Sequence, residues 1–322
     1  MSKELFEEIK RISEQNSSIV NKTPVFSSKT INDMTKLKVF FKCENFQKVG
    51  AFKFRGAYNA INSLSLDEKK NGVITHSSGN HAQAVALAGK LLKVKTTIVM
   101  PNNAPEVKKK ATLGYGADVV ICEPNQESRE KTTQKLINEN HYTLIHPYDN
   151  INVIKGAGTA CLELINKIGE LYCVLAPVGG GGLISGTSIV AKESKKVKKV
   201  FAVEPLGADD AYQSFYQKKL IPQLNPQTIA DGLRTSLSEL TFKIILKYVD
   251  QIFTVDEKYI INAMQLLFER MKIVVEPSSA VPLAALLQYN HDFLQIPNHS
   301  RVGIIISGGN VNLENFFRTL KK

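Results

Sequence analysis

A lysine flanked by aromatic residues is the first candidate for chemistry in this chain. Lys53 lies between Phe52 and Phe54, just after Gly50, in the run AFKFRGA at positions 51–57. Apolar neighbours disfavour the ammonium form and lower the pKa of an amine, as a lysine that forms a Schiff base requires. Taken alone, the motif is better explained by a lysine whose stem lies along core aromatics while its ammonium reaches water. Other motifs must therefore decide whether Lys53 is catalytic.

A run of four glycines indicates an anion site. The glycines at positions 179–182 follow an apolar run typical of a strand and precede a helical pattern that begins with Leu183. A flexible linker would have polar flanks, whereas a strand, a bare loop and a helix start direct backbone N–H groups and a positive dipole end at an anion. The loop lacks the lysine of a P-loop and the Gly-x-Gly-x-x-Gly spacing of a dinucleotide site. We therefore expect a compact monophosphate here, with a structural turn as the alternative.

Two polar clusters stand at the ends of expected strands. The run SGGN at positions 307–310 follows an apolar strand, at the carboxyl end where α/β proteins place ligands. A tight turn explains this run equally well. The run SSGNH at positions 77–81 also follows a strand and opens a helix rich in alanine and valine. A serine cap accounts for one hydroxyl of that run but not for the whole cluster.

The elements that position these motifs alternate along the chain. Apolar runs of strand length and helical patterns follow one another from residue 38 to the C-terminus, which is typical of βαβ units with a parallel sheet. The fold class is therefore α/β. We expect nine strands, at Lys38–Cys43, Gly72–Thr75, Thr96–Met100, Asp118–Ile121, Tyr142–Ile145, Cys173–Val178, Lys199–Val203, Gln251–Thr254 and Val302–Ile306. A helix over residues 256–271 should be capped by Asp256 and bury the stripe Ile260, Met264, Leu267 and Met271.

Composition excludes several classes of protein. The 322 residues are 43% hydrophobic and 22% charged, with no apolar run that approaches the length of a membrane span. The net charge is +11, but the lysines are scattered or lie in solvated clusters such as residues 192–199, so we expect no nucleic-acid partner. The N-terminal residues mix acids and bases, unlike a secretory signal. The cysteines lack a Cys-x-x-Cys pair and lie in apolar segments, which predicts buried thiols in a reducing cytoplasm: Cys43, Cys122, Cys161 and Cys173.

The motifs together, in this order, resemble the fold-type II pyridoxal-phosphate enzymes, the group of serine and threonine dehydratases. The likeness runs from about Thr23-Pro24 to Asn310-Val311, nearly the whole chain. It implies a fold like that of the tryptophan synthase β subunit, in which two domains each contain a parallel sheet and the cofactor lies in the cleft. The large domain would comprise residues 1–71 and 150–322, and the small inserted domain residues 72–149.

The resemblance also implies a role for each motif. Lys53 would carry pyridoxal 5'-phosphate as a Schiff base, with Phe52 against the cofactor ring. Asn80 would bond the ring hydroxyl and Ser307 the pyridine nitrogen. A serine at that position leaves the pyridine largely unprotonated and tempers its electron withdrawal. The phosphate would be held by the backbone N–H groups of Gly179, Gly180, Gly181, Gly182 and Leu183.

The implied substrate is a small hydroxy amino acid such as serine. Lys53 would take the α-proton on one face and Ser78 would serve the other, which inverts L- and D-serine. Loss of the β-hydroxyl instead gives pyruvate and ammonia. The resemblance places these residues around the substrate: Ser77, Asn80, His81, Arg129 and Ser236.

The alternative is a dehydratase without significant inversion, acting on threo-3-hydroxyaspartate or on L-serine and L-threonine. Ala82 and Tyr148 favour this alternative, because mammalian racemases have glycine and asparagine there. Ser78 favours inversion, because threonine dehydratases usually carry alanine. A non-catalytic relative is disfavoured because Lys53, Ser78, Asn80 and Ser307 are all retained, and a nicotinamide oxidoreductase because the glycine fingerprint is missing.

Two further sites follow from the resemblance. Glu204 and Asp210, with Ala208 between them, match positions that bind a divalent cation (Mg²⁺, Ca²⁺ or Mn²⁺) through two carboxylates and a backbone carbonyl. Their spacing alone indicates only two solvated acids. Some family members also bind ATP as an effector at a homodimer interface, and Val49 departs from the threonine of mammalian members there. The matching residues are Lys48, Gln83, Tyr115 and Asn310.

Overall fold

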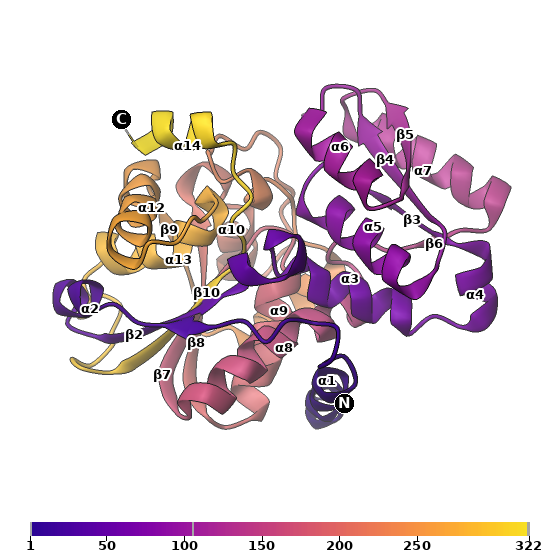
Figure 1. Cartoon of the computed structure of the whole chain (residues 1–322). Coiled ribbons are helices and arrows are strands. Elements are labelled where there is room, and N and C mark those ends of the chain that lie inside the picture. The colour runs from indigo at the N-terminus through magenta and orange to yellow at the C-terminus, as the bar shows by residue number, and fades with distance from the viewer. Residues whose placement is uncertain (1, 105, 321–322) are drawn as a thin grey trace.

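Two sheets form the framework of the protein. The structure, a computed structural model, describes residues 2–104 and 106–320. Figure 1 shows the sheets in separate halves of the molecule, with the strand orders β1-β2-β10-β7-β8-β9 and β5-β4-β3-β6. Neighbouring strands are parallel in both sheets, except that β1 pairs with β2 in the antiparallel sense. The predicted α/β class with parallel sheets is therefore confirmed.

All nine predicted strands are present, with ends that shift by at most two residues. The larger sheet contains β1 (Val25–Phe26), β2 (Lys38–Cys43), β7 (Leu171–Pro177), β8 (Val197–Pro205), β9 (Gln251–Val255) and β10 (Arg301–Ile306). The smaller sheet contains β3 (Val73–His76), β4 (Thr96–Pro101), β5 (Asp118–Cys122) and β6 (Thr143–Leu144). The sequence did not predict β1, because two residues at a sheet edge leave no periodic pattern.

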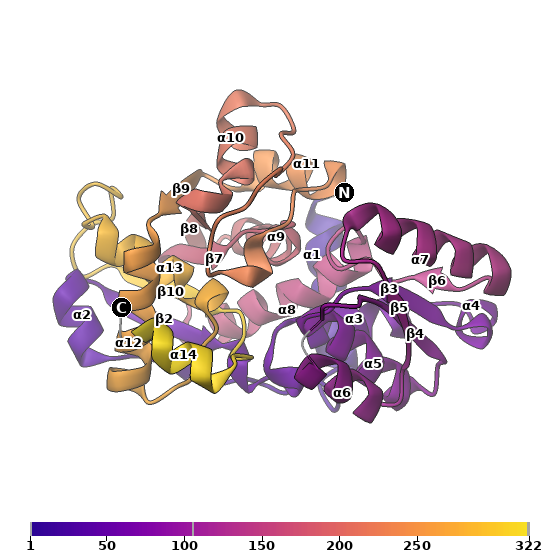
Figure 2. The same ribbon diagram turned by 90° about the horizontal axis from the view of Figure 1, so that it is seen from above.

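Helices cover both faces of the larger sheet. They are α1 (Ser2–Gln15), α2 (Lys29–Thr35), α8 (Ile151–Ile168), α9 (Gly182–Glu193), α10 (Asp210–Gln217), α11 (Glu239–Tyr248), α12 (Glu257–Met271), α13 (Pro277–Gln288) and α14 (Leu313–Leu320). Strand β7 shows the alternation: Cys173 and Leu175 join the core with α12 and α13, whereas Val174 and Ala176 face α8 and α9. Figure 2 shows α10 and α11 at one edge of this half.

The smaller sheet is also covered on both faces. Its helices are α3 (Lys53–Asn62), α4 (Leu66–Asn71), α5 (Asn80–Leu92), α6 (Glu106–Gly114) and α7 (Gln126–Asn140). Helices α3 and α5 share a core with Ile98, while α7 packs on the opposite face near Ile74. Helix α3 precedes the predicted small domain in sequence but packs into this core. The domain boundaries at residues 72 and 149 stay a prediction.

The predicted side-chain cap of α12 is absent. Asp256 is the residue before α12, but its carboxylate makes no cap hydrogen bond, so that part of the prediction is wrong. The N–H of Asp256 donates instead to Oε1 of Gln288 at 2.8 Å.

All four cysteines are buried free thiols, as predicted. Within residues 2–104 and 106–320, no helix combines the length and the apolar character of a membrane span.

Candidate active site

The predicted lysine opens a helix in a partly buried position. Strand β2 and two short 3-10 turns lead to Lys53, the first residue of α3. Its Nζ donates a hydrogen bond to the carbonyl of Pro147 at 3.0 Å and lies 5.1 Å from the centroid of the Phe52 ring. Burial lowers the pKa of the Lys53 amine to about 8, although the carboxylate of Glu276 acts in the opposite direction. A usable fraction of neutral amine is therefore present near neutral pH.

The lysine segment meets the end of β10. The N–H of Phe52 donates to the carbonyl of Ser307 at 2.9 Å, and Ala51 forms a β-bridge with Gly308. The Ser307 hydroxyl is buried and lies 2.8 Å from the hydroxyl of Ser279. Ser307 therefore offers a fixed hydroxyl close to the backbone that carries Lys53.

The glycine loop forms a bare helix N-terminus. It joins β7 to α9, all four glycines are buried, and Gly181 has a φ of 85°. An added Cβ at Gly180 would lie 2.2 Å from the ring of Tyr148, so only glycine fits there. No side chain caps α9, and in the described part of the chain the N–H groups of Gly180, Gly181 and Leu183 make no hydrogen bond. Buried donors without an acceptor at a helix start suit a phosphate.

The polar run after β3 bonds to the other half of the molecule. Asn80, the first residue of α5, donates from Nδ2 to both carboxylate oxygens of Glu276, at 2.9 and 3.1 Å. Its Oδ1 accepts a bond from Nδ2 of Asn310 at 2.9 Å. The Ser77 hydroxyl accepts the N–H of Gly79 at 3.2 Å. These contacts tie the start of α5 to Glu276, directly before α13, and to Asn310, which follows β10.

Ser78 and His81 differ in how they are held. His81 is buried, and its Nε2 lies 2.9 Å from the carbonyl of Ile145. Burial, with a further contribution from Lys53, holds the pKa of His81 well below its usual value, so the ring is neutral. Ser78 is half-buried, and its hydroxyl makes no hydrogen bond to any described residue. That hydroxyl is free to meet a ligand.

Glu276 was not identified from the sequence. It lies directly before α13, is 6% exposed, and is the carboxylate that acts on the Lys53 amine. An acid before a proline at a helix start is common and carries no functional signal. Only the folded chain brings it to Asn80 and Lys53, which are distant in sequence.

The predicted acidic pair joins the end of β8, which carries Glu204, to the start of α10, which carries Asp210. Glu204 accepts the N–H groups of Ala211 and Tyr212, at 3.2 and 2.7 Å, and is fully buried. Burial and the neighbouring Asp210 hold the pKa of Glu204 well above its usual value, and burial raises that of Asp210 to about 7. Two buried carboxylates that resist ionisation together are a donor set that a hard cation would satisfy. Within the described residues no group of three or more His, Cys, Asp or Glu side chains converges, so carbonyl or water oxygens would complete the coordination.

The comparison with known proteins decides the family. Residues 17–308 match the family described as "Pyridoxal-phosphate dependent enzyme". The chain belongs to this family. It is 48% identical to the serine racemase of Dictyostelium discoideum, over 97% of each chain. It is 45% identical to the L-threo-3-hydroxyaspartate ammonia-lyase of Saccharomyces cerevisiae, over 92% of this chain and 90% of that one. The structure of maize serine racemase superposes with a TM-score of 0.93 at 41% identity, covering 98% of this chain and 96% of that chain.

The site has the chemistry that this family needs. The cofactor combines an aldehyde, which takes a lysine amine, with a phosphate, which takes N–H donors. Lys53 has a lowered pKa, and the start of α9 has buried N–H groups without acceptors in the described chain. The residues present therefore fit pyridoxal phosphate.

Two predicted substrate residues lie on separate elements. Arg129 is half-buried on α7, and its charge helps burial to lower the pKa of His76 at the end of β3. Ser236 accepts the N–H of Gln223 at 2.8 Å, so its hydroxyl oxygen already has a partner. Arg129 is thus near the strand end that carries the polar run, whereas Ser236 is engaged in its own loop.

Two of the predicted effector residues, Lys48 and Asn310, meet at one short segment. Asn310 donates from Nδ2 to the carbonyl of Val49 at 2.6 Å and to Asn80. Val49 has a φ of 57°, which is strained for a β-branched residue. Lys48 precedes it, Tyr115 packs against the same apolar cluster as Val49, and Gln83 is nearly buried on α5.

Proposed function

We propose that the protein interconverts L- and D-serine and also eliminates water from serine to give pyruvate and ammonia. The observation that carries the proposal is the Lys53 amine, whose pKa is lowered to about 8, beside a helix N-terminus with unpaired N–H donors in the described chain. The substrate rests on the serine racemases to which the chain is similar.

The cofactor contacts in this proposal are those that the sequence predicted. In the proposal Lys53 holds the cofactor covalently and Phe52 lies against its ring. Asn80 bonds the ring hydroxyl, Ser307 bonds the pyridine nitrogen, and the loop from Gly179 to Leu183 binds the phosphate. Bound pyridoxal phosphate supplies an electron sink that eases removal of the α-proton of an amino acid.

Two groups move the α-proton in this proposal. The Lys53 amine accepts or returns it on one side, since burial keeps a fraction of the amine neutral. The Ser78 hydroxyl, which bonds to no described residue, serves the other side. Ser77, Asn80 and His81 surround the substrate carboxylate, with Arg129 and Ser236 as outer contacts.

The second candidate is a dehydratase of threo-3-hydroxyaspartate or of L-serine and L-threonine. Tyr148, whose ring packs against Gly180, favours it, because mammalian serine racemases have asparagine at this position. A panel of L-serine, D-serine, L-threonine and threo-3-hydroxyaspartate, assayed for oxo acid and for inversion, separates the candidates. Inversion of serine supports the proposal, whereas oxo acid from 3-hydroxyaspartate without any inversion supports the alternative.

We also propose the cation and effector sites and the assembly. Glu204 and Asp210, with the carbonyl of Ala208, bind Mg²⁺, Ca²⁺ or Mn²⁺ and order the loop between β8 and α10. Lys48, Gln83, Tyr115 and Asn310 bind ATP as an effector in a cytoplasmic homodimer. The support is the buried acidic pair for the cation and the bonds of Asn310 to Val49 and Asn80 for the effector.

A further inference from the structure

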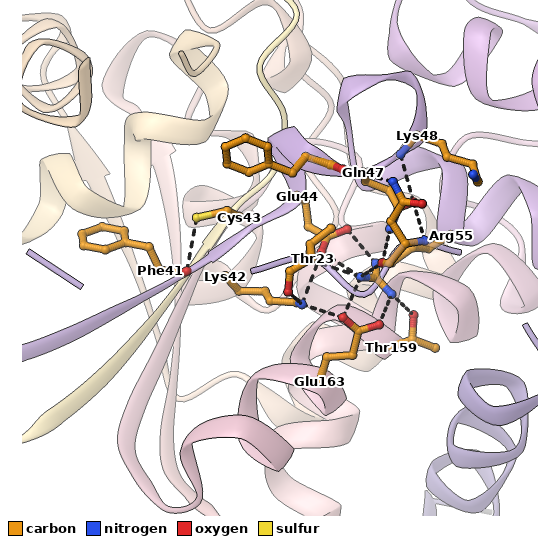
Figure 3. A network of polar contacts seen from close by, with 12 residues as sticks. Thr23, Phe41, Lys42, Cys43, Glu44, Gln47, Lys48, Arg55, Thr159 and Glu163 are labelled. Atoms are coloured by element: carbon orange, nitrogen blue, oxygen red, sulfur yellow. Dashed lines mark hydrogen bonds and ion pairs between the residues drawn. The ribbon is translucent and has the colours of Figure 1, made fainter. Parts of the chain in front are cut away.

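Four charged side chains meet beside the lysine helix, three of them buried and one half-buried. We call Lys42, Glu44, Arg55 and Glu163 the charge cluster; Figure 3 shows Arg55 between the two carboxylates. Nε of Arg55 lies 2.6 Å from Glu44, and Nη1 lies 2.7 Å from Glu163. Lys42 donates to Glu163 at 2.5 Å. Arg55 and Lys42 are each 1% exposed and Glu44 is fully buried, whereas Glu163 is 14% exposed, so the balanced charges are largely shielded from water.

Every donor of the Arg55 guanidinium is used. Besides the two carboxylates, it bonds Thr159 Oγ1 at 3.1 Å and the carbonyl of Asn21 at 3.2 Å. Burial alone would lower the pKa of Arg55, but Glu44 and Glu163 outweigh burial and raise it. A buried ion network of this kind is weak evidence for stability, because desolvation offsets much of the attraction. It does fix one geometry, because an unpaired charge here would be costly.

The geometry that the cluster fixes includes the first turn of α3. Arg55 lies two residues after Lys53 in that turn, and the preceding Phe52 provides no side-chain cap. Glu44 comes from the 3-10 turn after β2, and Glu163 comes from α8. The cluster therefore ties the start of the lysine helix to a strand end and to a second helix.

The segment that leads into α8 carries the hydrogen-bond acceptor of the Lys53 amine. Helix α8 begins at Ile151, shortly after Pro147, whose carbonyl accepts the Lys53 bond. Its Gly156 packs on the backbone of α3, because an added Cβ there would lie 2.4 Å from the carbonyl oxygen of Arg55. The donor of the Lys53–Pro147 hydrogen bond lies on α3, and its acceptor lies shortly before α8. The ion pair between Arg55 and Glu163 joins these two helices.

We propose that the charge cluster sets the position of the Lys53 amine, with Arg55 as the positioning residue. The inference rests on the proposed function, in which that amine holds the cofactor and moves the proton. In this proposal Arg55 contacts neither the cofactor nor the α-proton. It acts by holding the first turn of α3 against α8.

A cavity makes the proposal testable by chemical rescue. A cavity of about 470 Å³ lies against the cluster and is lined by Arg55, Thr159 and Glu163 together with residues between 12 and 22. Removing the Arg55 side chain opens its place to this cavity. Guanidinium added in solution can then occupy the vacated position between Glu44 and Glu163.

The experiment compares Arg55→Ala with wild type and with Lys155→Ala. Lys155 also forms an ion pair from α8, with Glu8 of α1, and does not join α3. In Arg55→Ala we expect kcat to fall on the order of a hundredfold, the cost of misplacing a reacting group by about 1 Å, with a smaller change in KM. Covalent attachment of pyridoxal phosphate to the apoprotein should slow in parallel, and Lys155→Ala should retain wild-type values for both.

Rescue distinguishes positioning from a general loss of structure. Guanidinium at millimolar concentration should restore part of both rates in Arg55→Ala, while urea and sodium chloride should not. Wild-type kcat and attachment rate in folded Arg55→Ala, or equal recovery with urea, would overturn the proposal. If Arg55→Ala does not fold, Glu163→Gln removes the charge that α8 contributes to the cluster and keeps the volume of the side chain; unchanged rates there overturn the proposal as well. A wild-type protein that binds no pyridoxal phosphate would instead contradict the proposed function.

Discussion

At the scale of single residues, the proposed activity depends on one amine and the groups that set its charge. Burial lowers the pKa of Lys53 to about 8, and the Glu276 carboxylate limits that fall. Asn80 donates two hydrogen bonds to Glu276 and so keeps this carboxylate in place. With a pKa of about 8, the Lys53 amine can act near neutral pH both as a proton carrier and as a nucleophile.

Attachment of the cofactor should follow the titration of this amine. Only the neutral form reacts, so the attachment rate to apoprotein should rise about tenfold per pH unit below the pKa of about 8 and level off above it. Glu276→Gln removes the charge that raises this pKa, so the midpoint should move to lower pH. Stopped-flow absorbance across a pH series measures both. Glu314→Gln, an exposed acid on α14, is the control, and an unmoved midpoint in Glu276→Gln would contradict the assignment.

Ser78→Ala tests the second proton carrier. The change should abolish inversion and attack on D-serine but leave elimination from L-serine substantially intact, because that reaction needs only the Lys53 side. Stability should hardly change, because the Ser78 hydroxyl bonds no described residue. Rates with both enantiomers and a melting curve give the answer. Equal losses with both enantiomers would mean that Ser78 only positions the substrate.

At the scale of elements, α8 holds two other helices through close backbone contacts. Gly156 meets α3, which carries Lys53, and Gly158 meets Gly186 of α9, which begins at the glycine loop. An added Cβ at Gly186 would lie 2.4 Å from the carbonyl oxygen of Ile154. The spacing between the amine and the anion loop therefore depends on glycines within helices.

Gly186→Ala should destabilise the protein by about 1–3 kcal/mol through overpacking, despite the better helix propensity of alanine. Gly114→Ala is the matched control, because a Cβ at this helix residue meets nothing within 4 Å. Chemical denaturation of the two variants measures the difference. Equal stability of Gly186→Ala and wild type would show that α8 and α9 can move apart without cost.

The sequence predicted the strands and the motifs that follow them better than it predicted which distant residues contact one another. Strand β2 was predicted with both ends correct, because the apolar run after Leu37 ends at a polar segment, whereas β1 is too short to carry a pattern. The glycine loop and Ser307 were singled out because each follows a strand, and Lys53 because phenylalanines flank it. Glu276 and Arg55 were missed as site-forming residues, since their partners lie far away in sequence and only packing brings them together. The sequence also could not show that the hydroxyl oxygen of Ser236 accepts a hydrogen bond from the N–H of Gln223.

At the scale of the whole molecule, the site joins the two halves. Asn80 belongs to the half with the smaller sheet, and its partners Glu276 and Asn310 belong to the other. Leu237 connects the acidic pair to the glycine loop. Its N–H donates to the carboxylate of Asp210 at 3.3 Å, and its side chain packs on Gly181. A cation at the acidic pair would thus stabilise the loop beside the glycine site.

Chelation should therefore lower melting temperature and activity together. A cation at one hundred times its Kd stabilises the folded state by about 2.7 kcal/mol, and this contribution should return on adding Mg²⁺, Ca²⁺ or Mn²⁺. Calorimetry with and without chelator measures it, and Glu204→Gln should remove the response. Unchanged melting in excess chelator, with metal analysis showing none bound, would exclude the site.

The central claim is that one site inverts serine as well as eliminating water from it. The direct measurement is chiral analysis of serine recovered after wild-type protein, loaded with pyridoxal phosphate, acts on L-serine in deuterium oxide. The account predicts D-serine with deuterium at the α-carbon, together with pyruvate, and neither product from Lys53→Ala. Pyruvate without any D-serine would contradict the claim and favour the dehydratase.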